Sequence, residues 1–509
     1  MNDGLRLLGP PSLVLALIVS GVHNPLVVSA CLSVLAGFFT YLAIPWVGDV
    51  FVKHGRFGQD RLKADRPVLP ESMGAMAGLI YIIALFLFIP VPFISWFRES
   101  GLGLGEGSSF PYNKLAQFLG GLLALMSMLF LGFADDVLDI RWRVKIWMPL
   151  ISSMPLLMVY AVTYGGTDVV VPVPLRALIG SKLLPLGGFY YAFMAALAIF
   201  STNAINILAG VNGVEAGQSL VIAVSIALND CLQLQRNPAR SEAHLSSLYF
   251  VLPFIGVTIG FLKHNWYPAR AFPGDSYCYF AGMIFAVVGI LGNFSKTVLL
   301  FMLPQIFNFI YSCPQLFGFV DCPRHRMPSC DHKTNLLQYT TFLLTAKRGK
   351  LATLGKPMIS LLHFLGLVKL TTVTVPATNI ADSLDAVTAS PVEVGGRRAS
   401  GGKMNGKGKG KAKPGKLSYP PRPMLSPAGS SSALHATTAS SSSSSPTTTE
   451  THVNNLTIMN LMLVKLGPMT EQQLAICVVV FQAACSVLAF GVRYLAVQWV
   501  YNVVEDDRM

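Results

Sequence analysis

The chain is 509 residues long, with 52% hydrophobic and only 12% charged residues. Soluble domains average about 25% charged residues, so this composition and a mean hydropathy of +0.54 exclude an ordinary soluble globular protein. The net charge of +13 does not indicate a nucleic-acid partner, because eight of these charges lie in residues 397–416, a tract without any acid.

Apolar runs recur along the whole chain. A bilayer-spanning helix needs about 20 mostly apolar residues, and ten segments are predicted as spans: approximately 25–49, 73–97, 115–134, 147–163, 187–208, 217–230, 247–262, 276–292, 297–313 and 470–500. Residues 1–24 form an amino-terminal extension; its run 11–22 is expected to extend the first span or to lie at the interface, with a cleaved signal peptide as the alternative. The predicted fold class is therefore all-α: a polytopic membrane protein of about ten transmembrane helices.

Basic residues are concentrated in alternate loops, after the first, third and seventh spans. Short loops rich in Lys and Arg remain in the cytosol, so the loops after odd-numbered spans are predicted to share one cytosolic face. The domain prediction follows: a transmembrane catalytic core over 25–330, a cytosolic loop over 331–375, and a last helix with the carboxyl terminus over 451–509. Between them, residues 376–450 are predicted to be a disordered insert, because a Gly/Lys and Ser/Thr/Pro tract cannot bury a core. The insert is either a spacer or a segment attracted to anionic lipid headgroups.

Two adjacent carboxylates, Asp135 and Asp136, follow the third apolar run. Carboxylates beside a membrane helix cost desolvation energy and are usually retained for a function. Neighbours on a helix point about 100° apart, so these two are expected to differ in role. Arg141, Arg143 and Lys145 follow closely and supply cations for an anionic substrate.

Amides and a further acid mark the ends of other spans. Asn203 and Asn206 are three residues apart, so a helix presents both on one face, either as packing contacts or toward a ligand. Asn212-Gly213 predicts a turn that could contact a base or sugar. Asp275 opens the eighth span, where it is either a helix cap or a Mg²⁺ ligand.

A cationic motif, Arg324-His325-Arg326, follows the ninth span. Arginine is suited to bidentate phosphate recognition, although a cluster of this kind also occurs as a simple orientation signal. Together with the acids and amides on the same face, the motif indicates a Mg²⁺-diphosphate site. The residues alone thus predict a phosphotransferase that uses a nucleotide diphosphate and a membrane-held acceptor.

With these motifs the sequence resembles the polyprenyl-phosphate N-acetylhexosamine-1-phosphate transferases, and especially their eukaryotic dolichyl-phosphate branch. The resemblance covers about 25–330 and 455–503 and rests on five motifs: Gly132-Phe-Ala-Asp-Asp, Asn203-Ala-Ile-Asn-Ile-Leu-Ala-Gly, His264-Asn-Trp-Tyr-Pro, Gly274-Asp275 and Pro323-Arg-His-Arg. It implies transfer of GlcNAc-1-phosphate from UDP-GlcNAc to dolichyl phosphate with release of UMP. It also implies a multi-pass protein of the endoplasmic reticulum membrane, a cytosolic active site and a homodimer.

The resemblance also assigns roles residue by residue. It implies that Asn206 and Asp275 bind Mg²⁺. It also implies that Lys145, Asp135 and Asp136 act in catalysis. The expected substrate contacts are Gln59, Asp60, Arg61, Glu71, Asn203, Asn212, Gly213, Val214, Phe272, Arg324, His325 and Arg326. The expected surroundings of the lipid phosphate are Ile199, Phe200, Ser201, Thr202, Asn203, Ala204, Ile205, Asn206 and Ile207.

Two alternatives remain open from the sequence. A nucleotide-sugar transporter also carries polar residues within its spans, but its site would lie near the bilayer midplane rather than at span ends. A bacterial-type sugar-1-phosphate transferase acting on undecaprenyl phosphate would share the carboxylate pair and the later acid.

Overall fold

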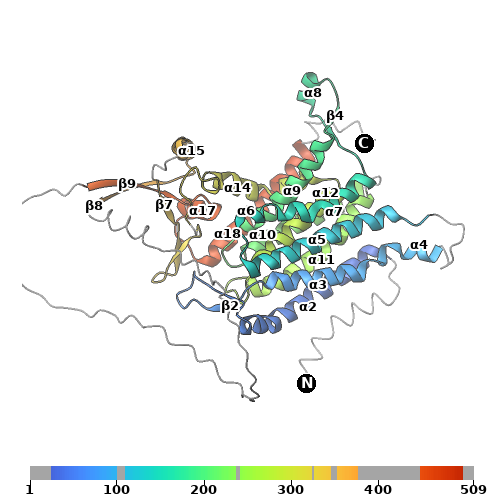
Figure 1. Ribbon diagram of the computed structural model, residues 1–509, viewed down its shortest axis with the longest axis horizontal. Coiled ribbons are helices and arrows are strands. Elements are labelled where there is room, and N and C mark those ends of the chain that lie inside the picture. Colours follow the sequence, from blue (N-terminus) through green and yellow to red (C-terminus); the bar gives the residue numbers. More distant parts are fainter. Residues whose placement is uncertain are drawn as a thin grey trace, which may run out of the picture. The chain divides into compact units, whose positions relative to one another are not determined.

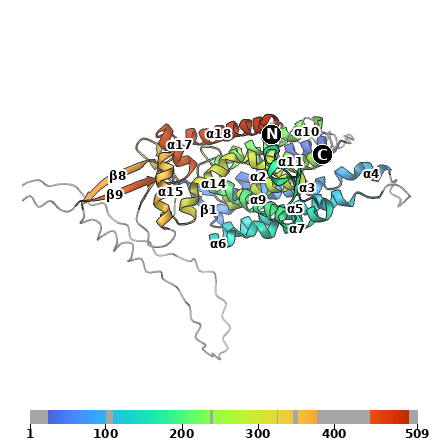
Figure 2. The ribbon, with the colours of Figure 1, turned by 90° about the horizontal axis from the view of Figure 1, so that it is seen from above.

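The computed structural model describes residues 24–99, 109–236, 241–323, 326–344, 352–376 and 447–496. Contacts divide the chain into two units, residues 1–371 with 452–509 and residues 372–451. The first unit contains a bundle of long helices that lie side by side (Figures 1 and 2).

Nine segments of the described chain are long and apolar enough to cross a membrane. Their main helices are α2 (Pro25–Lys53), α3 (Met73–Phe88), α5 (Tyr112–Leu138), α7 (Met148–Thr163), α9 (Gly188–Ile207), α10 (Val214–Arg236), α11 (Ser241–Asn265), α12 (Gly274–Leu291) and α18 (Glu471–Gly491). Short helices prolong three of them: η1 (Val91–Phe93) and α4 (Ile94–Glu99) after α3, α6 (Trp142–Lys145) before α7, and η3 (Val492–Ala496) after α18. A tenth candidate is the pair α13 (Ser295–Phe301) and α14 (Leu303–Leu316), which is bent by 73°. The prediction of an all-α polytopic membrane protein with about ten spans is confirmed.

Helix α12 lies at the centre of the bundle, with every residue from Ser276 to Leu291 buried. Glycines bring its neighbours close. A Cβ added at Gly74 of α3 would lie 2.2 Å from the Tyr277 side chain, and one at Gly132 of α5 would lie 2.8 Å from the Ser276 Cα. On the α9 side, a Cβ at Gly282 would lie 2.4 Å from the Thr202 Cα. Helices α3, α5 and α9 therefore pack directly against the α12 backbone.

Helices α2 and α11 pack through a second set of glycines. A Cβ at Gly256 would lie 2.0 Å from the Ser33 carbonyl oxygen, and one at Gly260 would lie 2.2 Å from the Gly37 carbonyl oxygen. Small residues spaced four apart allow membrane helices to approach closely, because lipid provides no hydrophobic force that would drive the helices together.

The bend between α13 and α14 is stabilised by buried amides. Gln482 of α18 donates its Nε2–H to the Phe301 carbonyl oxygen at 2.8 Å. Gln305 of α14 donates to the Oε1 atoms of Gln218 and Gln482, at 2.7 Å each. Irregular backbone at membrane depth requires such partners within the protein, so α10 and α18 hold the bent span in place.

The remaining elements are short. The antiparallel pairs are β1 (Phe57–Gln59) with β2 (Val68–Pro70), β3 (Asp168–Val170) with β4 (Leu183–Pro185), and β5 (Ser329–Asp331) with β6 (Leu336–Gln338). A three-stranded sheet has the order β7 (Thr341–Leu343), β9 (Thr447–Asn454), β8 (Leu370–Pro376). The short helices that remain are α8 (Val173–Ile179), α15 (Ala352–Phe364) and α17 (Ile458–Leu466).

The structure adds detail to two predicted segments. Residues 331–375, predicted as a cytosolic loop between spans, carry β6, β7, α15 and most of β8 where they are described. Of the predicted insert, residues 377–446 lie outside the described residues, whereas Pro376 and residues 447–450 belong to strands β8 and β9. Residues 1–23 of the amino-terminal extension are also outside the described chain, and Asn24 caps α2 by accepting from the Leu26 N–H at 3.0 Å.

Replacing Gly256 with Ala should weaken the contact between α2 and α11, because the new methyl group would collide with the Ser33 carbonyl. Overpacking of this kind costs about 1–3 kcal/mol, so a lower melting temperature in detergent is expected. The matched control is Gly491→Ala in α18, where a Cβ meets nothing within 4 Å. An unchanged melting temperature for Gly256→Ala would contradict the close packing.

Candidate active site

Helix ends from distant parts of the sequence meet at one end of the bundle. Helices α2, α5, α9 and α11 end there, and α3, α7, α10, α12 and α18 begin there. Contacts between these ends connect Asp135, Lys145, Asn206 and Asp275. The structure therefore brings these four predicted site residues together.

The Lys145 ammonium group lies between two carboxylates. Its Nζ is 2.8 Å from Asp135 Oδ2 on α5 and 3.0 Å from Asp275 Oδ2 on α12. Asn206, at the end of α9, donates its Nδ2–H to Asp275 Oδ1 at 2.9 Å. We call these four residues the Lys145 cluster. Asp275 keeps 27% of its side chain exposed, whereas Asp135 is fully enclosed, so a ligand can reach Asp275.

Asp135 is held by donors on several sides. The Ile140 backbone N–H donates to Oδ1 at 3.0 Å, and the Tyr279 hydroxyl donates to Oδ2 at 3.1 Å. With Lys145 as a third partner, the carboxylate is fixed in position and orients the lysine.

Asp136 has a different role. Its Oδ1 accepts from the Asp275 backbone N–H at 2.7 Å, and its Oδ2 accepts from the Ser276 N–H at 3.1 Å. These are free donors at the start of α12, so Asp136 caps that helix from α5. The two adjacent aspartates thus have different contacts. Because Asp136 caps α12, the Asp275 side chain does not serve as the cap, and its carboxylate contacts Lys145 instead.

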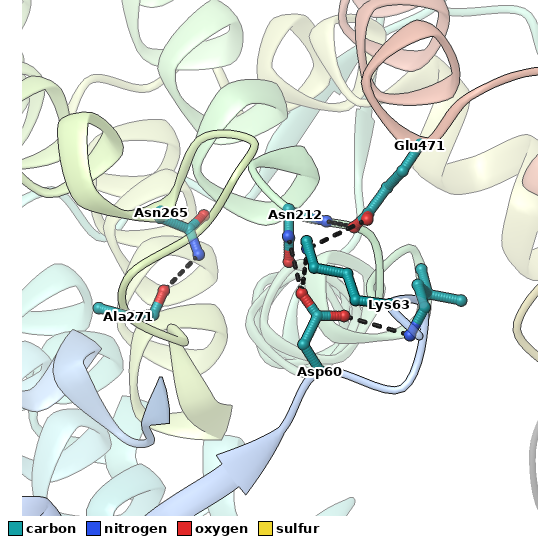
Figure 3. Close-up of polar contacts among 7 residues, drawn as sticks. Asp60, Lys63, Asn212, Asn265, Ala271 and Glu471 are labelled. Atoms are coloured by element: carbon teal, nitrogen blue, oxygen red, sulfur yellow. Dashed lines mark hydrogen bonds and ion pairs between the residues drawn. The ribbon is translucent and has the colours of Figure 1, made fainter. Parts of the chain in front are cut away.

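A second polar group lies nearby and is shown in Figure 3. Asp60 accepts from Asn212 Nδ2 at 3.1 Å and contacts the Lys63 ammonium group. Glu471, at the start of α18, accepts from the Asn212 backbone N–H at 3.0 Å and lies 3.3 Å from Lys63 Nζ. We call Asp60, Lys63, Asn212 and Glu471 the Lys63 cluster.

The charge of Lys63 is stabilised within this cluster. Burial alone would lower the pKa of Lys63, but the hydrogen bond to Asp60 and the charge of Glu471 raise it above its ordinary value. Its ammonium group also lies 5.1 Å from the centre of the Tyr267 ring. The cluster therefore joins the first loop, the α9–α10 turn, the α11–α12 loop and the last span.

The segment that leads into α12 connects the two clusters. Phe272 donates its N–H to the Pro70 carbonyl at 2.9 Å and accepts from the Met73 N–H at 3.0 Å. Its ring covers Gly58 of β1, where a Cβ would lie 3.1 Å from a ring carbon. Asn265 supports the same loop by donating to the Ala271 carbonyl at 3.0 Å (Figure 3).

Other predicted substrate residues surround this area. Gln59, Arg61 and Glu71 are exposed, and Val214 is buried at the start of α10. Partial burial and the nearby charge of Asp275 raise the pKa of Glu71. Gly213 has a φ of +82°, and a Cβ there would lie 2.6 Å from the Trp266 ring, so only glycine suits this turn.

Arg326 carries an unused donor. Asn460 of α17 donates its Nδ2–H to the Arg326 carbonyl at 2.7 Å and so fixes the backbone. The Nη1 atom is buried and has no hydrogen-bond partner among the described residues. Desolvation lowers the pKa of Arg326. Buried polar atoms normally have a hydrogen-bond partner, so this donor is available for an acceptor such as a phosphate oxygen. Arg324 and His325 lie outside the described residues.

Burial differs among residues 199–207, which are expected around the lipid phosphate. Its buried members, which lie inside the bundle, are Ser201, Thr202, Ala204 and Ile205. Ile199, Phe200, Asn203, Asn206 and Ile207 are half-buried. Asn203 donates to the Ile199 carbonyl of its own helix at 2.8 Å, so only Asn206 of the two amides reaches the Lys145 cluster.

Sequence reasoning did not single out Lys63, Tyr279, Asn460 and Glu471. Glu471 carried a signal, since an acid at the start of an apolar span resembles Asp275 in its setting. Lys63 is one of the basic residues in the loop after the first span, and these residues indicate only which side of the membrane the loop occupies. Nothing in the sequence around Tyr279 or Asn460 distinguishes them from ordinary helix residues.

Comparisons with known proteins cover the part of the chain that contains this site. The family model described as glycosyl transferase family 4 matches residues 118–293, which include the whole Lys145 cluster. Together with the two relatives described next, this match shows that the chain belongs to a class of membrane-embedded transferases.

Two curated relatives specify the family. The UDP-N-acetylglucosamine–dolichyl-phosphate N-acetylglucosaminephosphotransferase of Schizosaccharomyces pombe is 50% identical over 343 residues, 65% of this chain and 77% of that protein. The protein of the same name from Saccharomyces cerevisiae is 44% identical over 350 residues, 66% of this chain and 78% of that protein. The chain belongs to this family. A phospho-N-acetylmuramoyl-pentapeptide-transferase of Clostridium botulinum is a distant relative at 23% identity, covering 53% of this chain and 74% of that protein.

Glu471→Gln should lower the melting temperature in detergent. The glutamine can still accept from the Asn212 N–H, but it removes a buried negative charge next to Lys63, at an expected cost of about 1–3 kcal/mol. Glu242→Gln is the matched control, because its ion pair with Lys114 is exposed and such pairs contribute about 0–1 kcal/mol. Equal melting temperatures for the two variants would show that Asp60 alone suffices for Lys63.

Proposed function

We propose that this protein transfers GlcNAc-1-phosphate from UDP-GlcNAc to dolichyl phosphate, giving GlcNAc-PP-dolichol and UMP. This is the first step in assembling the lipid-linked oligosaccharide for N-glycosylation. The names of the two relatives support the substrates. The observation that carries the proposal is the Lys145 cluster, which places a cation, two carboxylates and an amide at the ends of membrane helices.

We further propose that Mg²⁺ is the cofactor. Mg²⁺ takes oxygen ligands and is commonly held by one or two carboxylates together with substrate phosphates. The residues fit this requirement, because Asp275 is partly exposed and Asn206, whose Nδ2–H contacts that carboxylate at 2.9 Å, also carries an amide oxygen as a second oxygen ligand. When bound to Asp275 and Asn206, the ion would neutralise charge on the diphosphate.

The reaction forms one phosphorus–oxygen bond and breaks another. An oxygen of dolichyl phosphate attacks the β-phosphorus of UDP-GlcNAc, and UMP leaves with the electrons of the broken bond. A phosphate monoester has a second pKa of about 6, so at neutral pH the attacking oxygen needs little help from a base. The work left to the protein is to position the reactants and to stabilise charge.

Lys145 is placed for this electrostatic role. Its ammonium group is oriented by Asp135, which is itself fixed by Tyr279 and the Ile140 N–H. Because Asp135 already accepts from three donors, we assign it to holding Lys145. Asp136 acts indirectly, since its contacts hold the first turn of α12 and thereby place Asp275.

The nucleotide end of the substrate is assigned to the Lys63 cluster. The support is the short connection between the clusters, since Asn212 follows Asn206 by six residues and Phe272, which packs on Gly58 of the first loop, precedes Asp275 by three. Arg326 would bind a phosphate oxygen through its unused Nη1 donor. We assign binding of the acceptor phosphate to the half-buried side of α9 near Asn206.

We place the active site on the cytosolic face of the endoplasmic reticulum membrane. The support is the concentration of Lys and Arg in the loops on the same side as the Lys145 cluster. A homodimer is part of the proposal because of the family resemblance.

The proposal is tested with purified protein, Mg²⁺, dolichyl phosphate and UDP-GlcNAc labelled in the sugar. Label should move to an organic-extractable product with release of UMP. Asp275→Asn should lower turnover about 100-fold or more, since it removes a charge that acts at the reacting phosphates, and raising Mg²⁺ should restore part of it. The matched control, Asp168→Asn at an exposed strand, should keep full turnover. Absence of transfer by the unmodified protein would refute the function, and an active Asp275→Asn would refute the site.

Arg326→Ala should weaken UDP-GlcNAc binding. Loss of a charge-assisted hydrogen bond costs about 1.5–3 kcal/mol, which corresponds to a roughly 10- to 150-fold higher Kd by calorimetry. Arg270→Ala removes an exposed cation from the α11–α12 loop and serves as the control. Equal losses for both variants would indicate general attraction by positive charge instead of a specific contact.

A further inference from the structure

Helix α15 presents three faces with different chemistry. At about 100° per residue, Gly355, Ile359 and Leu362 lie on one face. A second face contains Leu354, Met358 and Leu361, and Leu365 continues it in the turn after the helix; we call these four residues the outer stripe. The third face, opposite the outer stripe, contains Lys356, Ser360 and His363.

The first face attaches α15 to the bent span. Ile359 is 1% exposed and belongs to a hydrophobic cluster with Tyr311 of α14 and with Val320. A Cβ at Gly355 would lie 2.3 Å from the Phe319 carbonyl oxygen, so the helix backbone rests directly on the turn after α14. Helix α15 is therefore packed firmly against the end of a membrane span.

The outer stripe is exposed although it is apolar. Leu354, Leu361 and Leu365 are 53%, 58% and 57% exposed, and the neighbouring Phe364 is 85% exposed. Contiguous apolar surface of this kind marks an interaction site in a protein. The amphipathic division between the outer stripe and the Lys356 face is the pattern of helices that lie in a membrane interface.

One hydrogen bond ties the chain just after α15 to α14. The Tyr311 hydroxyl donates to the Leu367 carbonyl at 2.7 Å, and Tyr311 precedes the last residue of α14 by five positions, about 7.5 Å along the helix at 1.5 Å per residue. The carboxyl-terminal end of α15 thus lies beside a turn within the span. On the same span, Ile310 and Phe317 are 62% and 52% exposed, so α14 also carries apolar side chains on its surface.

We propose that α15 is an interfacial helix that inserts its outer stripe and Phe364 into the bilayer leaflet on the active-site side. The Lys356 face would then remain in water. Lys465 supports this placement, because its Nζ lies 3.5 Å from the position of a Cβ on Gly366, next to the inserted end, where a cation can reach lipid headgroups. This inference does not depend on the proposed function.

The test uses full-length Phe364→Trp protein in nanodiscs of phosphatidylcholine with brominated acyl chains. The fluorescence added by the new tryptophan, measured as variant minus unmodified protein, should be quenched by the brominated lipid and not by aqueous iodide. Lys333→Trp, in the exposed turn between β5 and β6, is the matched control and should show the opposite pattern. Leu361→Trp is a second reporter in the outer stripe if Phe364→Trp does not fold.

Two outcomes would overturn the proposal. Quenching of the outer-stripe reporters by iodide, without an effect of brominated lipid, would show that the stripe faces water. Protection from both quenchers in discs with two copies, combined with iodide quenching in discs with one copy, would show that a second copy of the chain covers the stripe.

Discussion

The ion pairs of Lys145 with Asp135 and Asp275 are the constraint around which the active end of the bundle is built. Three charged groups at the ends of membrane helices are tolerated only if each one has partners. Here the lysine neutralises two carboxylates that come from α5 and α12, and Asn206 adds a contact from α9. The same interaction therefore ties three helices together and keeps Asp275 in a defined place. Loss of the lysine would leave two acids facing each other with little water.

Helix packing makes this arrangement possible. The acids can meet only because α5 and α9 approach α12 without intervening side chains at Gly132 and Gly282. Asp136 then replaces the missing hydrogen-bond partners at the start of α12, so α5 contributes both the cap and the anion that holds the lysine. Stability and function are thus carried by neighbouring residues, which explains why two adjacent aspartates occur at this position.

Residues from the last part of the chain complete the site. Glu471 contacts Lys63 and Asn212, and Asn460 holds the backbone of Arg326. Both follow residues 377–446, yet they join elements that precede this segment. Strands β8 and β9, which flank this segment, belong to one three-stranded sheet with β7, in which Thr341 pairs with Asn454. The sheet thus places the chain that follows the segment beside an element that precedes it.

The sequence by itself determined the membrane class, the approximate position of ten spans and the set of polar residues at their ends. Apolar runs of span length have few other stable solutions, and charges near lipid stand out because they are costly. It also predicted that Asp135 and Asp136 differ in role, since helix geometry separates neighbouring side chains. Only the tertiary structure decided which role each one has, because capping of α12 by Asp136 joins residues 139 positions apart. The same holds for Lys63, Asn460 and Glu471, whose partners lie up to 408 positions away. Contacts at that distance depend on helix packing and on the bend in the ninth span, and no local pattern in the sequence encodes them.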